Sequence, residues 1–512
     1  MNKFSNSPIF HYMTLYIAGA IATFSNPPFS ILPLIFGIGF GIYRINFLSS
    51  MIKIFLSAWF LGFGWFSFGL YWIGSAFFAA DTYHIFLMPI AIILLPSLLA
   101  VFWGSAFVCA KLVNRNTKFS ILYIIVFLSL FEFLRAQLFT GFPWLMPSMI
   151  FSSNIYLIQI FSFIGSFSTN IIVLIISILP FFLFSNFKGK NVLLFTLTTP
   201  IIILLFCGIL RNHNKSMLEN NNQLVTIVQP NIKQKNKWIL KNREQHLNKL
   251  FHLSIKNRDN FNNKNRIIIW PETSFEGSIP SETKLLSSIS KNILTNKKTT
   301  LILGLLRADE NRIFNSLVFL NSKGEIIYNY DKIKLVPFGE YIPFREHLGA
   351  FTDILAPKDF TSGKLKSNPT IDGFGKIITL ICYEILFKNE MVSRVSKNTN
   401  LLINITNDAW FGETIGPYQH LALAKIKAVE FGLSLARVAN TGISAYVSPY
   451  GKIIDKINLD EEGVKTFNLI PALERTLYKI YGEYIFIVSI FILLIINKIY
   501  HINIKEELFN EK

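Results

Sequence analysis

The sequence has few cysteines and few charged residues for its length. Three of its 512 residues are cysteine, and charged residues make up 16% of the chain. Three cysteines imply no disulfide framework, and no group of histidines, cysteines and acidic residues has the spacing of a metal site. The sequence therefore predicts neither a disulfide-stapled domain nor a metal centre.

Acidic residues are scarcer than basic ones, which gives the chain a formal net charge of +18. Such an excess could point to a nucleic-acid partner. The lysines, however, are dispersed among asparagines, and no stripe of basic and aromatic residues occurs. We therefore expect no nucleic-acid binding and attribute the charge to compositional bias and to membrane-flanking residues.

What the sequence has in abundance is apolar residues, which reach 51% of the chain, with aromatics at 15%. These values exceed those of ordinary soluble domains. Residues 1–210 are almost continuously apolar, whereas residues 211–480 carry normal polar surface. The sequence thus predicts a transmembrane domain over 1–210, an external globular domain over 211–480, and a final transmembrane helix with a cytoplasmic tail over 481–512.

Seven spans are expected in the first domain, because a helix needs about 20 mostly apolar residues to cross a bilayer. An eighth is expected near Tyr484 to Ile496. The seven lie near 9–25, 30–47, 53–76, 85–110, 119–139, 156–185 and 191–210.

Basic residues occur in alternate connections between these spans. Lys3, Arg44, Lys111 and Lys188 represent the basic connections, while the intervening ones carry no lysine or arginine. By the positive-inside rule the chain starts in the cytoplasm, and seven crossings put residues 211–480 on the external face.

Two ionisable residues, Glu132 and Arg135, lie three apart in the fifth expected span. Charged groups at such depth are costly and usually face a cavity or each other. The pair is therefore a candidate substrate contact, and a purely structural ion pair is an equal alternative.

The globular part contains an apolar, strand-like run from Lys376 to Ile381 that ends in Cys382, Tyr383 and Glu384. A buried strand that delivers one polar group at its end is a way to present a nucleophile at the rim of a sheet. A buried structural cysteine is the more common outcome when the residue is taken alone. Partners elsewhere in the chain must therefore decide between the two.

Two other apolar runs end in candidate partners. One leads into Trp270-Pro-Glu272, and the other leads into Lys332, which precedes the segment Leu335-Val-Pro-Phe-Gly-Glu340. Together with the segments Cys382-Tyr-Glu384, Asn407-Asp-Ala-Trp-Phe-Gly412 and Asn440-Thr-Gly-Ile-Ser444, this pattern resembles the apolipoprotein N-acyltransferase branch of the nitrilase superfamily.

The resemblance implies an enzyme with a Glu272–Lys332–Cys382 triad and no cofactor. Cys382 would be the nucleophile, Glu272 the base, and Lys332 with the backbone N–H of Tyr383 the oxyanion stabilisers. Glu340 and Glu384 would support the triad. The family takes a fatty acyl chain from a phospholipid and transfers it to the α-amine of a diacylglyceryl-cysteine apolipoprotein, at the periplasmic face of the bacterial inner membrane.

Buried strand-like runs alternate with helical segments between residues 223 and 438, which predicts an α/β layered domain. Helices are expected over 236–258, 281–296, 388–397 and 418–438. The resemblance implies the four-layer α-β-β-α sandwich of the nitrilases, which joins a polytopic α-helical membrane domain.

Further substrate contacts are expected around the triad. Trp238 matches an aromatic position of the family, and Asn407 and Trp410 follow another strand-like run at the same rim, although an Asx turn would equally explain Asn407. Phe344, Leu348, Phe351 and Leu355 recur at helical spacing and would suit an interfacial arm, with ordinary core packing as the default.

Two other functions share parts of this pattern. A membrane-anchored amidase acting on a small soluble amide would use the same triad but would not need seven spans. A transporter or receptor with an external sensing domain would explain the spans and make Cys382 incidental, although broken or charged mid-membrane sites are few.

Overall fold

The computed structural model describes residues 7–79, 85–113, 121–183, 190–213, 220–256, 264–294, 296–343, 345–348 and 359–510. Of the predicted interfacial arm, Phe344, Phe351 and Leu355 lie outside these residues. The chain divides into two compact units. A helical unit comprises residues 1–74, 87–214 and 476–512, and an α/β unit comprises residues 75–86 and 215–475.

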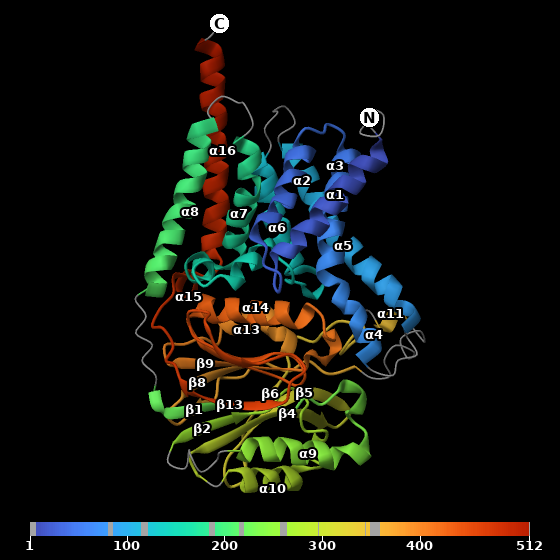
Figure 1. Ribbon diagram of the computed structural model, residues 1–512, viewed down its shortest axis with the longest axis vertical. Helices are drawn as coiled ribbons and strands as arrows, with labels where there is room; N and C mark the ends of the chain where they lie inside the picture. Colours follow the sequence, from blue (N-terminus) through green and yellow to red (C-terminus); the bar gives the residue numbers. More distant parts are fainter. Residues whose placement is uncertain are drawn as a thin grey trace. The chain divides into compact units, whose positions relative to one another are not determined.

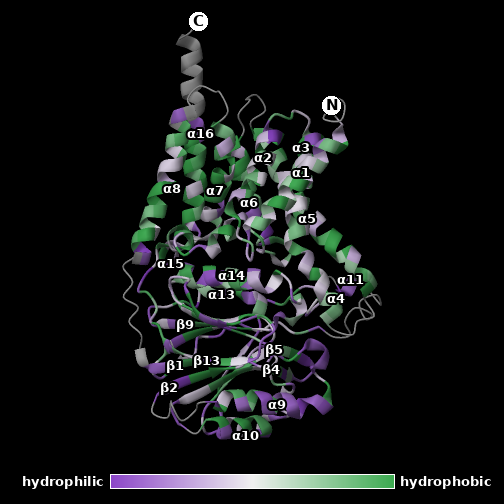
Figure 2. Ribbon diagram, in the orientation of Figure 1, coloured by the Kyte–Doolittle hydropathy of each residue, from purple (hydrophilic) through white to green (hydrophobic). Residues whose placement is uncertain are grey.

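Apolar helices build the first unit (Figures 1 and 2). A helix occupies each of the eight segments expected to span the membrane. The helices of this unit are α1 (Pro8–Ala22), α2 (Phe36–Asn46), α3 (Met51–Leu70), α5 (Met88–Val113), α6 (Ile121–Arg135), α7 (Ile160–Leu183), α8 (Lys190–His213), α15 (Leu477–Tyr481) and α16 (Tyr484–Asn510).

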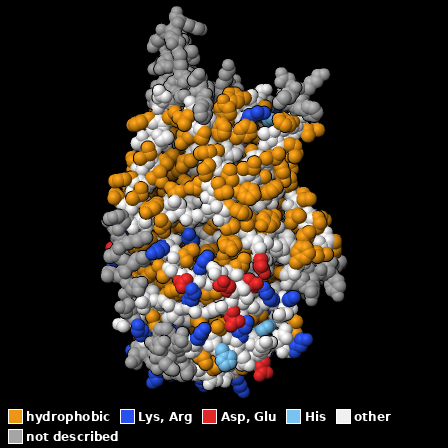
Figure 3. Space-filling model, in the orientation of Figure 1, with side chains coloured by type: hydrophobic (Ala, Val, Ile, Leu, Met, Phe, Trp, Pro, Cys, Tyr) orange, Lys and Arg blue, Asp and Glu red, His pale blue; other side chains and the backbone are white. Residues whose placement is uncertain are grey.

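Among the described residues, four helical stretches are long and apolar enough to cross a membrane. They are Met51–Ala79, Ile85–Val113, Leu157–Leu183 and Leu193–Asn212. The helices Leu32–Asn46 and Tyr484–Ile499 are apolar but shorter. Hydrophobic side chains cover much of the visible face of this unit (Figure 3), as expected where the solvent is lipid.

Two sheets form the centre of the second unit. The first has the order β13-β1-β2-β4-β5-β6, with β3 paired to β4. Its strands are β1 (Asn220–Gln229), β2 (Asn265–Ile269), β3 (Ser278–Ile279), β4 (Thr299–Asp309), β5 (Arg312–Leu320), β6 (Ile326–Asp331) and β13 (Gly463–Leu469).

The second sheet has the order β12-β11-β10-β9-β8-β7. Its strands are β7 (Thr370–Ile371), β8 (Gly375–Ile381), β9 (Thr399–Thr406), β10 (Ser434–Ala439), β11 (Ser444–Val447) and β12 (Ile453–Ile457). The central strands β8, β9 and β10 are parallel and buried over most of their length, as expected for strands covered on both faces.

Helices cover the outer face of each sheet, which confirms the predicted α-β-β-α sandwich (Figure 1). On the first sheet lie α9 (Leu240–Ile255) and α10 (Thr283–Ile293), and on the second lie α13 (Asn389–Val392) and α14 (Gly416–Phe431). The apolar side of α9 and α10 packs into one core with β2 and β4, around Leu250, Leu286 and Leu303. The short helices α4 (Ala76–Ala79) and α11 (Arg345–Leu348) also belong to this unit.

The predicted helix over 418–438 is correct as far as Phe431 and wrong from Gly432 onward. Gly432 takes the left-handed conformation, with φ of 64°, and ends α14 at Phe431. Residues 434–439 then form β10 at the centre of the second sheet. The helix expected over 388–397 shrinks to Asn389–Val392.

Candidate active site

Cys382 follows β8 directly, at the carboxyl end of a buried parallel strand. Its neighbour in the sheet, β9, ends in register with it, because Ile381 pairs with Ile405. The Cys382 backbone has a φ of 53°, in the left-handed region that costs a non-glycine residue energy. The chain turns sharply there into a short 3₁₀ helix, Cys382–Leu386, and the thiol is buried.

Glu272 comes from the other sheet, three residues after β2. Its loop lies directly on β4 at Gly304, where an added Cβ would come within 2.6 Å of the Thr273 nitrogen. Glycine is therefore needed at position 304 for the loop to approach so closely. Across the sandwich, the backbone N–H of Asn407 donates to Oε2 of Glu272 at 2.8 Å.

Lys332 follows β6 and joins two carboxylates. Its Nζ lies 2.8 Å from Oε1 of Glu340 and 3.5 Å from Oε1 of Glu272, and the side chain is 1% exposed. The side-chain amide of Asn315 donates to the same two oxygens, at 2.7 Å to Glu272 and 2.9 Å to Glu340. The structure therefore brings together the residues that the sequence placed at the ends of separate strands.

Charge balance in this cluster decides the protonation states. Burial opposes the charge on Lys332, but the carboxylates of Glu340 and Glu272 more than offset it and raise the pKa of the lysine. Burial, and then the charge of Glu272, raises the pKa of the Cys382 thiol, against the opposing effect of Lys332. At neutral pH the thiol is thus protonated and needs a base before it can attack.

The Glu384 side chain is fully buried, and its carboxylate accepts hydrogen bonds mainly from backbone N–H groups. Its Oε1 accepts hydrogen bonds from the N–H groups of Ile333 and Lys334, at 2.6 and 3.1 Å, and from the Tyr330 hydroxyl at 3.0 Å. Its Oε2 accepts from the N–H of Ile381 at 2.8 Å. Glu384 therefore ties the segment after Lys332 to the residue before Cys382.

The aromatic residues expected near the site differ in burial. Tyr383 is buried and packs edge-on against Phe387, with ring centroids 4.9 Å apart. Trp238 and Trp410 are exposed by 44% and 39%. Trp238 lies in a turn with a φ of 67°, and its backbone N–H donates to Oε2 of Glu276 at 2.8 Å.

Asn407 contacts the site through its backbone, whereas its side chain is otherwise engaged. Its amide donates to Gln234 at 2.8 Å and its carbonyl oxygen accepts from Asn440 at 3.1 Å. The sequence had left open whether Asn407 contacts substrate or stabilises a turn, and these contacts favour a structural role for its side chain.

Glu132 and Arg135 belong to the helical unit and form a buried salt bridge at 2.5 Å. Trp103 donates to Glu132 at 2.8 Å, and Arg135 donates to the carbonyls of Phe142 and Trp144. This network satisfies both charges within the unit, which favours the structural alternative for the pair.

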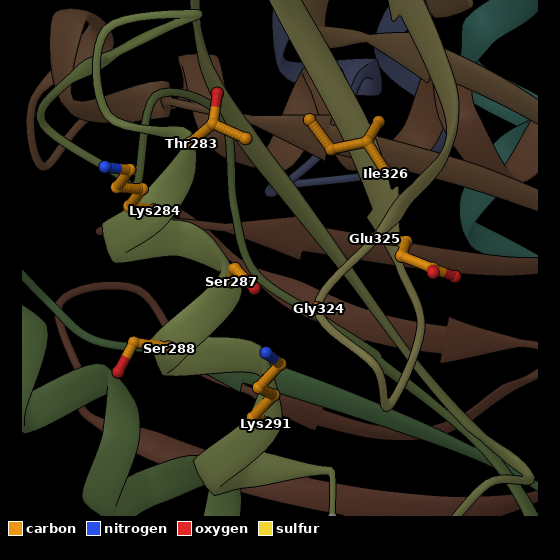
Figure 4. A pocket seen from close by; sticks show the side chains of 8 residues that line it. All are labelled: Thr283, Lys284, Ser287, Ser288, Lys291, Gly324, Glu325 and Ile326. Atoms are coloured by element: carbon orange, nitrogen blue, oxygen red, sulfur yellow. The ribbon is translucent and has the colours of Figure 1, made fainter.

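A separate hollow of about 660 Å³ lies between α10 and the turn that joins β5 to β6 (Figure 4). Thr283, Ser287 and Lys291 face the turn residues Gly324 and Glu325 across it. None of the residues predicted for the site lines this hollow, and we assign it no catalytic role.

Known proteins match both units of the chain. Residues 18–179 match the model of the apolipoprotein N-acyltransferase N-terminal domain, and residues 224–476 match that of the carbon-nitrogen hydrolases. An apolipoprotein N-acyltransferase from Rhodopseudomonas palustris is 32% identical over 493 residues, covering 91% of each chain. The chain belongs to the apolipoprotein N-acyltransferase family.

Other members of the apolipoprotein N-acyltransferase family match at similar levels. The enzyme of Allorhizobium ampelinum is 33% identical and covers 81% of this chain and 80% of its own, and that of Brucella melitensis is 30% identical with 88% of each covered. Among solved structures, an amidase from Nesterenkonia sp. is 18% identical, covers 50% of this chain and 94% of its own, and has a TM-score of 0.37.

Asn315 is a residue of this site that the sequence analysis missed. It lies on β5, beside Ser316, and only its two carboxylate contacts reveal its place. The available signal was that Asn315, with Ser316, interrupts a buried run from Phe314 to Leu320 that is otherwise apolar. Its Oδ1 is buried and has no hydrogen-bond partner among the described residues, so the nitrogen alone carries its contacts.

Replacing Asn315 with leucine is expected to slow acylation of Cys382 by about 10- to 100-fold, because Glu272 and Glu340 lose a shared donor and their spacing. Pre-steady-state acylation measures this. Ser316→Ala is the matched control, since its side chain points to the opposite face of β5 and bonds to Asp331. Equal rates in Asn315→Leu and Ser316→Ala would contradict the assignment.

Burial also makes Glu384 a source of pH-dependent stability. Burial raises the pKa of Glu384 from 4.5 to about 7, although backbone donors oppose it. A carboxyl whose pKa is raised by folding contributes its stability at low pH and loses it as pH rises through the folded value.

The unfolding free energy of the wild type relative to Glu384→Gln is therefore expected to fall by about 3 kcal/mol as pH rises from 4.5 to 7, because glutamine does not titrate. Unfolding of the two proteins in detergent at several pH values measures the difference. A constant difference across this range would show that Glu384 keeps an ordinary pKa.

Proposed function

We propose that this protein transfers a fatty acyl chain from a membrane phospholipid to the α-amine of a diacylglyceryl-cysteine apolipoprotein, through a thioester on Cys382. The observation that carries the proposal is the buried cluster in which Lys332 bridges Glu272 and Glu340 beside the thiol. Membership of the family supports the choice of acyl transfer over the amidase and the transporter.

In the first half-reaction, Cys382 Sγ attacks the ester carbonyl carbon of the phospholipid. Glu272 takes the thiol proton and passes it to the oxygen of the leaving lysophospholipid as the C–O bond breaks. The charged Lys332 and the backbone N–H of Tyr383 stabilise the oxyanion. Glu340 holds Lys332 in place through the 2.8 Å ion pair.

In the second half-reaction, the neutral α-amine of the apolipoprotein attacks the thioester carbonyl. The C–N bond forms, the C–S bond breaks, and Glu272 relays the amine's proton to the departing Cys382 sulfur. Aminolysis of a thioester is favourable because an amide is the more stable product. The free enzyme is restored, as in a ping-pong cycle.

Exclusion of water from the cluster supports transfer over hydrolysis. Glu272, Lys332 and Cys382 are each less than 10% exposed. The exposed Trp238 and Trp410 offer apolar surface for a lipid chain, and we propose them as contacts of the donor. The resemblance of the segments around Trp238 and Trp410 to those of the family supports these roles.

Sidedness is proposed from the basic connections. Arg44 and Lys53 flank one basic connection of the helical unit, and Lys111, near the end of α5, belongs to the next basic connection, so we assign the α/β unit to the external, periplasmic face of the inner membrane. Phospholipid and lipoprotein would both reach the site from that face.

The choice of acceptor tests the function. Purified protein is incubated with phospholipid vesicles and a peptide that begins with diacylglyceryl-cysteine, and transfer is followed by mass spectrometry. We expect one added acyl chain on the free-amine peptide and none on its N-acetylated form. Transfer to neither, with ammonia released from small amides, would replace the proposal with the amidase.

A further inference from the structure

The carbonyl of Cys382 is held by two side chains that the reaction scheme does not use. The Nδ2 of Asn404 donates to this oxygen at 3.2 Å, and Nε2 of His420 lies 3.3 Å from it. A carbonyl oxygen can only accept, and so can the Asp408 carboxylate that Nδ1 faces at 2.9 Å, so His420 makes both hydrogen bonds as the imidazolium, with a hydrogen on each ring nitrogen. Burial and the charge of Arg437 lower the pKa of His420, and Asp408 opposes them. Both side chains are fully buried.

A buried charge network fixes these two donors in turn. Nδ1 of His420 lies 2.9 Å from Oδ1 of Asp408. The Arg437 guanidinium donates one hydrogen bond to Oδ2 of Asp408, at 2.7 Å, and another to Oδ1 of Asn404, at 2.5 Å. The Thr406 hydroxyl adds a bond to Asp408 at 2.8 Å. Asp408 and Arg437 are fully buried charges, and removing any of their hydrogen-bond partners would leave a charge in the interior without compensation.

The network rests on rigid elements rather than on loops. Asn404 and Arg437 pair directly across the parallel strands β9 and β10, and His420 lies in α14 over the same sheet. Gly442 leaves room for Asp408, since an added Cβ would come within 2.7 Å of its Cβ. The donors are therefore placed before any substrate binds.

The carbonyl they hold shares a peptide plane with the proposed oxyanion donor. The peptide bond is planar and trans, so the C=O of Cys382 and the N–H of Tyr383 point in opposite directions and rotate together. Fixing the carbonyl on one side thereby fixes the direction of the N–H on the other. The left-handed φ of Cys382, which is costly, needs such an external hold.

We propose that Asn404 and His420, supported by Asp408 and Arg437, are positioning residues that orient the Tyr383 N–H toward the developing oxyanion. This inference rests on the proposed function, because it assumes that Cys382 is acylated through a tetrahedral intermediate. Hydrogen bonds to the carbonyl also polarise the peptide group and strengthen its N–H as a donor.

Two reactions of the same thiol separate this role from a structural one. Acylation by an ester passes through an oxyanion, whereas alkylation by iodoacetamide displaces iodide and forms none. Both reactions need the thiol to be folded, accessible and deprotonated. A residue that only stabilises the fold would therefore affect the two rates alike.

The experiment compares His420→Phe, His420→Gln and Val429→Ala in full-length protein. Phenylalanine keeps a ring but removes the donor, and glutamine restores an N–H. Val429 is buried in the same helix, nine residues on and so on the opposite side, and its truncation controls for loss of stability. Acylation is measured with phospholipid and with a p-nitrophenyl ester, and alkylation with iodoacetamide.

We expect His420→Phe to acylate about 100-fold more slowly with both esters while its alkylation rate stays within about threefold of the wild type. His420→Gln should recover most of the loss, and Val429→Ala should alter neither rate. Unchanged acylation in His420→Phe, or acylation and alkylation that fall in proportion, would overturn the proposal.

The two esters also distinguish this inference from the proposed function. Wild-type protein that is acylated by the p-nitrophenyl ester but not by phospholipid would refute the phospholipid donor, and the response of His420→Phe would still decide the positioning role. Wild-type protein that is alkylated but acylated by neither ester would overturn both.

Discussion

Replacing Cys382 with alanine is expected to reduce acyl transfer by at least about 10⁴-fold, because both steps of the proposed route need this residue as the covalent nucleophile. The structure supplies no second thiol to the α/β unit: the other two cysteines of the chain, Cys109 and Cys207, lie in α5 and α8. Transfer from phospholipid to the diacylglyceryl-cysteine peptide measures the loss.

The matched control is the variant in which Cys109 and Cys207 are both alanine. Both residues are only partly buried, and they lie in the helical unit. This variant should transfer at the wild-type rate, and it leaves Cys382 as the single thiol of the protein. Transfer that survives Cys382→Ala would mean that the acyl chain passes directly from donor to acceptor.

Replacing Glu272 with glutamine is expected to slow acylation by about 10²- to 10⁴-fold, because the thiol, whose pKa burial raises, loses the carboxylate that we propose as its base. Three donors surround the carboxylate, from Lys332, Asn315 and the Asn407 backbone. In Glu272→Gln, the amide NH₂ group of the glutamine would face at least one of these donors, and that hydrogen bond would be lost. Single-turnover acylation between pH 6 and pH 9 measures the effect.

A buried Glu–Lys pair elsewhere in the unit provides the control. Lys427 and Glu430 in α14 lie 2.6 Å apart, and both are buried. Glu430→Gln breaks a pair of the same kind and should lower stability without changing the acylation rate of the folded protein. If Glu272→Gln and Glu430→Gln lose activity equally, the loss reflects folding and Glu272 is not the base.

The sequence predicted which residues stand at the ends of strands, but it did not predict the hydrogen bonds that connect these residues across the two sheets. Cys382, Glu272 and Lys332 each follow an apolar run, and such runs are visible without any knowledge of contacts. Their convergence depended on the resemblance, because strands β2 and β8 lie in different sheets. The bonds of Glu384 to backbone across 50 residues of chain were not predictable from composition.

Residues after 431 show a second limit of prediction. The run Leu433-Ser-Leu-Ala-Arg437 has helical composition and continues the apolar pattern of α14, so it reads as one helix. Gly432 was the available stop signal, because glycine readily takes the left-handed conformation that ends a helix, as it does here before β10. Because Arg437 was expected in a helix, its place beside Asp408 could not be anticipated.

The same limit applies to His420. From the sequence it is one histidine in a helix, where a buried, satisfied side chain is the usual outcome. Its contact with the Cys382 carbonyl joins residues 38 apart, and it depends on how α14 lies over β8 and β9. Such a contact requires the packed structure.

The most direct test of the central claim is the mass of Cys382 after incubation with phospholipid. In the variant lacking Cys109 and Cys207, the peptide that contains Cys382 should gain the mass of one fatty acyl chain, with an equal amount of lysophospholipid released. Hydroxylamine or the diacylglyceryl-cysteine peptide should remove it. Folded protein that releases no lysophospholipid and carries no adduct on Cys382 would contradict the account.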